Sequence, residues 1–492
     1  MKHKNDVYDL IQSLSKSELR YVQLSLRNSR HEQSDYSILL KEFRKQKEYN
    51  EALIKDQFKG TSFVKQFDVK KHYLYNSIIK HLHAYHHNKN KHNKIPEHVD
   101  LLISKGLFNQ ALRTTKSGLS KAIRREDFSL ILRLLDQKER ISHYLPDQIN
   151  RSEIQQKLAH FLRLYQLHFH YSSILIEIKS LAEKYTFCRT KEHLDVVGLI
   201  LKDPLMELES EPVSIKCRKI YWEIKYLVAG TSGRWKEAMT CALNELNVLQ
   251  NDSLDKNLRM SWMDTVCVHL ITSSIHTKNF IESEKWIDKF IKLGEQIHSQ
   301  EELLRHEFRF VFYRLVESNK SRKILKDSSN LQLAEDFLNE HIDKVEPSSV
   351  NYLLFEIAKS YFHLGNYKEA SKYNMKVLVN SETSTYSHDL YAFSAIFDLV
   401  LSFEKRDMDL IESRCRRTRS NLKKRKILYS FEDKFLKLAQ TKLGAVTFSD
   451  KEEISNTFKG IQGILEPLYS NEPGHSILNY FDFDNWIKSK IN

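Results

Sequence analysis

Residues 352–378 read YLLFEIAKSYFHLGNYKEASKYNMKVL, and this stretch decides the fold class. Its apolar residues recur at intervals of three and four on both sides of Gly365, which is the spacing of one face of an α-helix. A single glycine between two such segments acts as a hinge between helices. The stretch therefore predicts two amphipathic helices folded back on each other as a hairpin.

Weaker copies of the second half of this unit recur along the chain. Each copy has a turn and then a small residue at which two helices can approach closely. The small residues of these copies are Ala111, Ala238, Ser283, Ala334, Ala370 and Ser413. The copy at Ser413 is fainter, and the copy at Ala334 lacks the aromatic residue. The longest gap, between Ala111 and Ala238, fits three periods of about 42 residues. A recurrence of this kind is the signature of a helical-repeat array, in which stacked hairpins share one continuous core.

The unit at 352–378 resembles a tetratricopeptide repeat, a helix–turn–helix module. The matching residues are Leu354, Ile357, Ala358, Tyr361, Leu364, Gly365, Tyr367, Ala370, Val377 and Leu378. It departs from the pattern at Asn374, where a bulky residue is usual, and at Glu382, where proline is usual. The period of about 43 residues is also longer than the usual 34 of the family. The resemblance implies an α-solenoid, a right-handed superhelix of tetratricopeptide-like hairpins.

Composition agrees with an all-α fold and suggests three regions. The chain of 492 residues has only 12 Gly and 7 Pro, too few for many β-turns, and its 41% hydrophobic content suffices for a folded core. A tract rich in His, Asn and Lys ends at Pro96 and reads as a boundary. We expect a basic helical N-terminal region at 1–96, helical repeats at 97–440, and a helical C-terminal cap at 441–492.

Nothing in the sequence indicates catalysis. It contains no phosphate-binding glycine loop, no nucleophile elbow and no zinc-protease motif, and its five cysteines form no C-x-x-C pair. We therefore expect no enzyme activity, no catalytic residue, no metal and no cofactor. The longest apolar stretch, 390–403, is too short to cross a bilayer, and no signal peptide is evident at the start. These features predict a cytoplasmic protein without a membrane partner.

One stripe on the first helix of the best unit is a candidate partner-binding groove. Tyr352, Phe355, Lys359 and Phe362 lie on one side of that helix. In proteins with tetratricopeptide repeats the corresponding stripe lines the concave face and holds a peptide. The expected function is therefore a non-enzymatic scaffold that binds a peptide or helix of a partner protein, of unknown identity. The alternative is that the aromatic residues of the stripe pack on the next repeat.

Positive charge is concentrated in two places. The formal net charge is +13, residues 1–96 carry 19 Lys and Arg against 10 Asp and Glu, and residues 414–426 carry eight basic residues and no acid. If this run is helical, Ile411, Cys415, Thr418 and Leu422 form its buried stripe. The remaining faces hold the candidate polyanion-binding residues Arg414, Arg416, Arg417, Arg419, Lys423 and Lys424. The alternative functions are thus a nucleic-acid- or ribosome-associated factor using both basic segments, or a regulator with a DNA-reading helix near 63–80. A plain solvated helix face is the other interpretation of the run.

Overall fold

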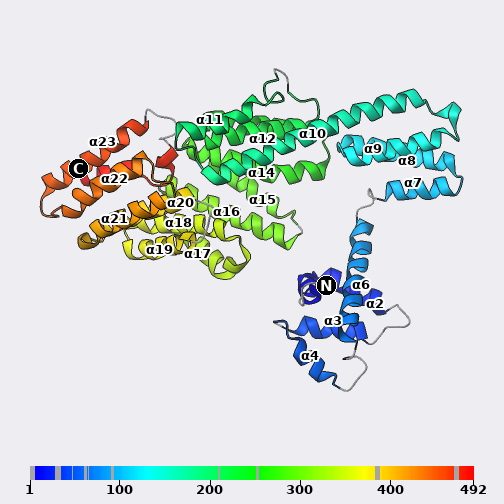
Figure 1. Ribbon diagram of the computed structural model, residues 1–492, viewed down its shortest axis with the longest axis horizontal. Coiled ribbons are helices and arrows are strands. Elements are labelled where there is room, and N and C mark those ends of the chain that lie inside the picture. The colour runs from blue at the N-terminus through cyan, green and yellow to red at the C-terminus, as the bar shows by residue number, and fades with distance from the viewer. Residues whose placement is uncertain are drawn as a thin grey trace. The chain divides into compact units, whose positions relative to one another are not determined.

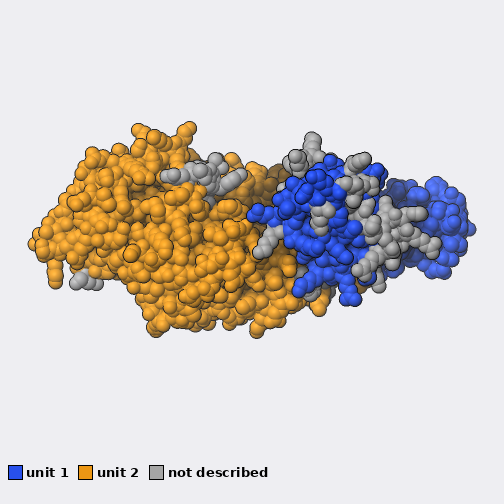
Figure 2. Space-filling model, turned by 90° about the horizontal axis from the view of Figure 1, so that it is seen from below, with its two compact units in different colours: residues 1–123, 127–159 blue, residues 124–126, 160–492 orange. Residues whose placement is uncertain are grey.

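The computed structural model describes all residues except 1–5, 28–34, 47, 60–63, 65, 90–93, 209–210, 251–253, 298, 383–387, 470–475 and 492. The described residues form α-helices and a few short 3-10 helices, with no strand among them (Figure 1). The all-α prediction is confirmed. The chain divides into two compact units, residues 1–123 with 127–159 and residues 124–126 with 160–492 (Figure 2). The boundary expected at residue 96 lies within the first unit and stays a prediction.

The first unit begins with a small helical core. Its helices are α1 (Asp6–Ser13), α2 (Lys16–Arg27), α3 (Asp35–Lys45), α4 (Glu51–Gln57), α6 (Phe67–Lys89), α7 (Ile95–Ser104), α8 (Phe108–Arg124), α9 (Phe128–Ser142) and the first residues of α10 (Arg151–Tyr185). Helices α1, α2, α3 and α6 bury Val22, Phe43 and Leu74 completely. Helix α2 starts with a reciprocal cap, because the Ser15 N–H donates to the Glu18 carboxylate at 2.8 Å and the Glu18 N–H to the Ser15 hydroxyl at 3.3 Å.

The second unit is a series of helical hairpins. The pairs are α12 (Ile215–Thr231) with α13 (Trp235–Leu249), α14 (Lys256–His276) with α15 (Phe280–Gly294), α16 (Gln300–Lys320) with α17 (Ser329–His341), α18 (Pro347–His363) with α19 (Tyr367–Glu382), and α20 (His388–Glu404) with α21 (Met408–Lys424). Helices α22 (Ser430–Thr441), α23 (Lys451–Tyr469) and α25 (Phe483–Ile491) follow. Each helix packs on its neighbours in the chain, and one hydrophobic core runs from Val311 to Ile487. This solenoid-like series agrees with the expected architecture.

The hairpin turns, except that between α16 and α17, share one backbone geometry. Gly365 has a φ of 76°, and the N–H of Asn366 donates to the carbonyl of Tyr361 at 2.9 Å, which closes the end of α18. The same left-handed backbone conformation and the same type of hydrogen bond occur at Gly106, Gly233, Lys278, Arg406 and Lys426. Since three of these six are not glycine, the sequence signal is weak there although the turn is the same.

The residue five positions after each left-handed residue packs at the hairpin contact. Ala111, Ala238, Ser283 and Ala370 occupy this position and are completely buried, as predicted. Ser413 does not. After the turn at Arg406 the position belongs to Ile411, which is completely buried, whereas Ser413 is exposed. The prediction of Ser413 is wrong because the backbone turn sets the register, and a small residue by itself does not mark the contact.

The stretch between Ala111 and Ala238 also differs from the expected pattern. Three regular periods were predicted there, but α10 alone has 35 residues and is followed by the nine-residue α11 (Lys191–Leu199). No turn interrupts the 35 residues of α10, so the regular period does not extend through this stretch.

The connection between α10 and α11 enters the core of the second unit. The Arg189 side chain is 1% exposed, and its guanidinium pairs with Asp389 of α20 at 3.2 Å and with Glu432 of α22. The rings of Phe393 and Tyr429 each lie 4.8 Å from the guanidinium carbon. Burial, together with repulsion from Glu432, raises the pKa of Asp389 to about 7 in spite of Arg189. One arginine thus joins two helices that are 200 and 243 residues away in sequence.

The shared turn geometry predicts opposite effects for two glycine-to-alanine changes. Gly365→Ala places a side chain at a left-handed position, so the free energy of unfolding should fall by about 1 kcal/mol. Gly463→Ala, in the exposed middle of α23 with nothing within 4 Å of the added carbon, should raise it by about 0.5 kcal/mol. Denaturant unfolding followed by tryptophan fluorescence measures both, because all five tryptophans lie in the second unit. A loss in both variants would contradict the backbone argument.

The buried arginine predicts an order of stabilities. Arg189→Met leaves Asp389 and Glu432 buried without a counter-charge, so unfolding by the same assay should need about 3–5 kcal/mol less free energy. Asp389→Asn removes one of two carboxylates that share a cation, and should lower the free energy of unfolding by much less. Because the folded pKa of Asp389 is raised above its ordinary value, its contribution to stability is lost as pH rises toward 7. The stability of Asp389→Asn relative to the native chain should therefore increase from pH 5 to pH 7, and a flat difference would contradict the assignment.

Candidate functional site

The predicted groove stripe lies on α18 and is largely covered by protein. Phe355 is 2% exposed and its ring meets that of Phe397 on α20 at 5.7 Å. Lys359 is 5% exposed and pairs with Glu356 at 2.6 Å. Tyr352 and Phe362 are half-buried. The stripe is thus mostly an internal contact, as in the alternative interpretation of these residues, and only its ends reach the surface.

Two segments of the chain itself cover the face formed by the first helices of the hairpins. From the connection after α10, the Thr186 hydroxyl lies 3.2 Å from that of Tyr352. From the segment before α25, the ring of Tyr480 stacks on Phe393 with centroids 4.1 Å apart, and the ring of Phe481 meets that of Phe362 at 5.2 Å. The position at which a peptide was expected is therefore filled in part by residues 480–481.

A cleft of about 410 Å³ remains open beside this segment. Its walls come from four places: the end of α14 and the turn after it, the end of α16, the end of α18, and residues 478–488. Its cationic side chains are Lys278, Lys320, Arg322, Lys359 and Lys488, and its carboxylates are Asp482 and Asp484. Of the predicted groove residues, Lys359 alone is among those lining the cleft. The cleft is therefore a candidate binding site with an excess of positive charge.

Arg322 organises one side of the cleft. Its backbone is left-handed, with a φ of 62°, directly after α16. One guanidinium nitrogen pairs with Asp482 at 2.7 Å, and the other donates to the Nδ1 atom of His363 at 2.6 Å. Burial, with Arg322 and Lys359 nearby, lowers the pKa of His363 to about 3. His363 is therefore a neutral acceptor, which fits the bond that it receives.

The floor of the cleft is a polar network between α16 and α18. Asn319 donates to the Glu356 carboxylate and to its carbonyl oxygen, both at 3.0 Å. The Ser360 hydroxyl donates to the Asn319 side-chain oxygen at 2.8 Å, and Lys359 to Glu356. Since each of these groups is buried and bonded, the network fixes the position of Lys359.

Lys320, at the end of α16, is a second group of the cleft whose pKa is strongly shifted. Desolvation and then repulsion from Lys359 lower its pKa to about 8, against the smaller opposing effects of Glu356 and Asp482. Lys278 adds to the lowering. Several cations are thus held close together, which makes the charged state of Lys320 less favourable than in water.

The basic run lies on α21, as expected. Ile411, Cys415 and Leu422 are buried and Thr418 is half-buried, so the predicted inner stripe is confirmed. The candidate polyanion-binding residues with exposed side chains are Arg416, Arg417, Arg419, Lys423 and Lys424. Arg416 and Arg419 pair with Glu412 at 3.2 Å and Asp433 at 2.7 Å, so part of this charge is compensated on the surface.

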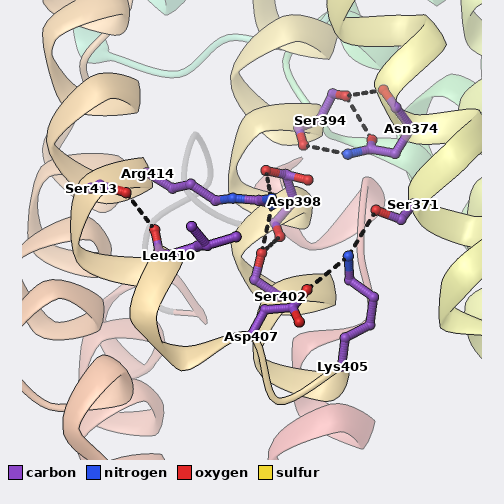
Figure 3. A network of polar contacts seen from close by, with 10 residues as sticks. All are labelled: Ser371, Asn374, Ser394, Asp398, Ser402, Lys405, Asp407, Leu410, Ser413 and Arg414. Carbon is purple, nitrogen blue, oxygen red and sulfur yellow. Dashed lines mark hydrogen bonds and ion pairs between the residues drawn. The ribbon is translucent and has the colours of Figure 1, made fainter.

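Arg414 differs from the other candidates because it points into the structure (Figure 3). Its guanidinium donates to Asp398 at 2.7 Å and to the Ser402 hydroxyl at 2.8 Å, both on α20. Burial raises the pKa of Asp398 although Arg414 opposes the shift. Arg414 therefore serves to hold α21 against α20.

The same view explains why Asn374 stands where the repeat pattern has a bulky residue. Its amide donates to the Ser394 carbonyl at 2.9 Å and accepts from the Ser394 hydroxyl at 2.6 Å (Figure 3). Both residues are completely buried, so α19 and α20 meet through a matched polar pair.

Sequence reasoning missed the cleft and the buried Arg189. The cleft is assembled from four stretches between residues 275 and 488, none of which forms a motif by itself. Arg189 stands in the sequence TFCRT, which carries no pattern that distinguishes a buried arginine from an exposed one. The five cysteines are buried and free, and burial raises the pKa of Cys188 to about 12.

No protein-family model and no curated protein sequence matches this chain. None of the helices that the structure describes is long and apolar enough to cross a membrane. Among the same residues, no group of three or more His, Cys, Asp or Glu side chains has the arrangement of a metal site.

The contrast between Arg414 and its neighbours predicts different effects of neutralisation. Arg414→Gln leaves the largely buried Asp398 without its cation, and should lower the free energy of unfolding by about 1–3 kcal/mol. Arg417→Gln, at an exposed position on the same helix, should change it by less than about 0.5 kcal/mol. Denaturant unfolding by tryptophan fluorescence compares the two. Equal losses would contradict the inward position of Arg414.

Proposed function

We propose that the protein is a non-enzymatic scaffold of the cytoplasm, and that the cleft of the second unit receives a segment of a partner protein. The observation that supports this most is the cleft itself. Its walls come from the ends of α14, α16 and α18, which are first helices of successive hairpins, and from residues 478–488. A site assembled across hairpins is the way in which a solenoid presents a binding surface.

The resemblance to tetratricopeptide repeats points in the same direction. In those proteins first helices line the groove that holds a peptide, and here the first helices α14, α16 and α18 supply His276, Lys320 and Lys359 to the cleft. The predicted groove residues Tyr352, Phe355 and Phe362 do not line the cleft. They hold α18 against α20 and the C-terminal segment. Lys359 is the member of the stripe that lines the cleft, where it pairs with Glu356.

A second candidate function rests on a different surface. Arg416, Arg417, Lys423 and Lys424 are exposed within a few turns of α21, which supports contact with nucleic acid or the ribosome. Arg416 and Arg419 pair with carboxylates, which compensates part of the positive charge of α21. This candidate is therefore weaker than the cleft.

A photo-cross-linking experiment on the full chain separates the two candidates. We replace Phe280, which lines the cleft, with p-benzoyl-phenylalanine and irradiate the protein in native cytosol with and without nuclease. A discrete protein adduct that survives nuclease is expected at this position. Ile281 is 84% exposed and does not line the cleft, so the same substitution there should give none.

The third position for the photo-reactive residue is Ser420, which is exposed on α21. Adducts from Ser420 alone that disappear after nuclease treatment would favour the nucleic-acid function and overturn the scaffold. Identical adducts from Phe280 and Ile281 would show that the cleft has no special role.

A further inference from the structure

Cations outnumber carboxylates among the described residues that line the cleft. Arg322 pairs with Asp482, and Lys359 pairs with Glu356. The lining then contributes three more lysines, Lys278, Lys320 and Lys488, but only one more carboxylate, that of Asp484. Burial, and then repulsion from Lys359 and Lys278, lower the pKa of Lys320. A ligand with negative charge would relieve this repulsion.

The segment beside the cleft shows what kind of group this face already accommodates. Residues 480–484 read Tyr-Phe-Asp-Phe-Asp. Tyr480 and Phe481 are 6% and 4% exposed and pack their rings on the first helices α18 and α20, while Asp482 pairs with Arg322 in the cleft. Next to the open space, the aromatic rings of this segment therefore pack on the helices, and its carboxylates lie among the cations.

We propose that the partner segment is acidic, and that its carboxylates enter the cleft among Lys278, Lys320 and Lys488 with an adjacent aromatic residue on the wall. This inference rests on the function proposed above, since it names the chemistry of the partner for the same site. The open volume of about 410 Å³ is at the lower end of the usual range for ligand sites, so it admits a few side chains and not a whole helix. The segment therefore binds through a short anchor.

The test uses the full-length protein and two labelled peptides, Gly-Tyr-Phe-Asp-Phe-Asp-Gly and the same peptide with Asn in place of both Asp residues. Fluorescence anisotropy at low salt measures each affinity. The Asp peptide should bind about tenfold or more tightly than the Asn peptide, because hydrogen bonds to charged groups are the stronger ones. Equal affinities, or no binding of either peptide at millimolar protein, would overturn the inference.

Matched lysine variants locate the binding. Lys320→Gln and Lys488→Gln should each weaken the Asp peptide about tenfold, and Lys424→Gln, on the exposed face of α21, should leave its affinity unchanged. Lys488 is exposed, so its variant keeps the test valid if Lys320→Gln does not fold. A loss in Lys424→Gln equal to that in the cleft variants would assign the peptide to the basic helix and overturn the inference.

The pH dependence provides a readout specific to Lys320. The groups that face it are Glu356 and Lys359 on α18, Lys278 after α14, and Asp482 before α25. Because the pKa of Lys320 is about 8, its positive charge is present below that pH and lost above it. Affinity for the Asp peptide should therefore fall between pH 7 and pH 9, and the fall should be absent in Lys320→Gln. A fall of equal size in that variant would contradict the assignment.

The outcomes also separate this inference from the proposed function. A protein adduct at Phe280 together with equal affinity for both peptides would retain the scaffold and reject the acidic segment. Inorganic phosphate that displaces the Asp peptide at equal concentration would indicate a site for a small anion and would likewise reject the peptide. Absence of an adduct at Phe280 together with absence of peptide binding would reject both.

Discussion

The buried ion cluster at Arg189 is the interaction on which the second unit depends. The connection after α10 comes nearly 200 residues before α20, and the guanidinium of Arg189 reaches both α20 and α22 from it. A solenoid held only by contacts between neighbouring hairpins can bend at any of them. A buried charge removes that freedom, because a small separation of Arg189 from Asp389 or Glu432 would leave a charge without a partner in a place that water does not reach. The cluster therefore determines how the C-terminal hairpins meet the segment that covers them.

Polar contacts between successive hairpins act in the same direction on a smaller scale. Asn374 and Ser394 join α19 to α20, and Arg414 joins α21 to α20 through Asp398. The floor of the cleft, with Asn319 and Glu356, joins α16 to α18. Apolar side chains alone would allow helices to slide by a turn, whereas each of these pairs is satisfied in one register only. The hairpins are thus positioned by specific bonds within a core that provides the driving force.

The chain itself covers the face formed by the first helices, and this limits which residues a partner can reach. Tyr480 and Phe481 occupy the face next to α18 and α20, so a partner does not meet the aromatic stripe directly. What remains accessible is the cleft, whose charge comes mainly from the ends of helices and the turns after them. Left-handed residues at Lys278 and Arg322 place long cationic side chains at these ends. The turn geometry that builds the hairpins therefore also contributes to the chemistry of the site.

The sequence alone determined the helices and the principal turns, because amphipathic spacing and the left-handed glycine at Gly365 act within a few residues. It also placed the buried stripe of α21 and the completely buried Ala111, Ala238 and Ala370. Tertiary contacts, by contrast, place Ile411 and not Ser413 at the hairpin contact, turn Arg414 inward and cover Phe355. Those outcomes depend on which distant segment lies opposite. The cleft needs residues from 275 to 488 to meet, and Arg189 needs partners 200 and 243 positions away. Local periodicity carries no information on such encounters, since it specifies which face of a helix is buried and not what buries it.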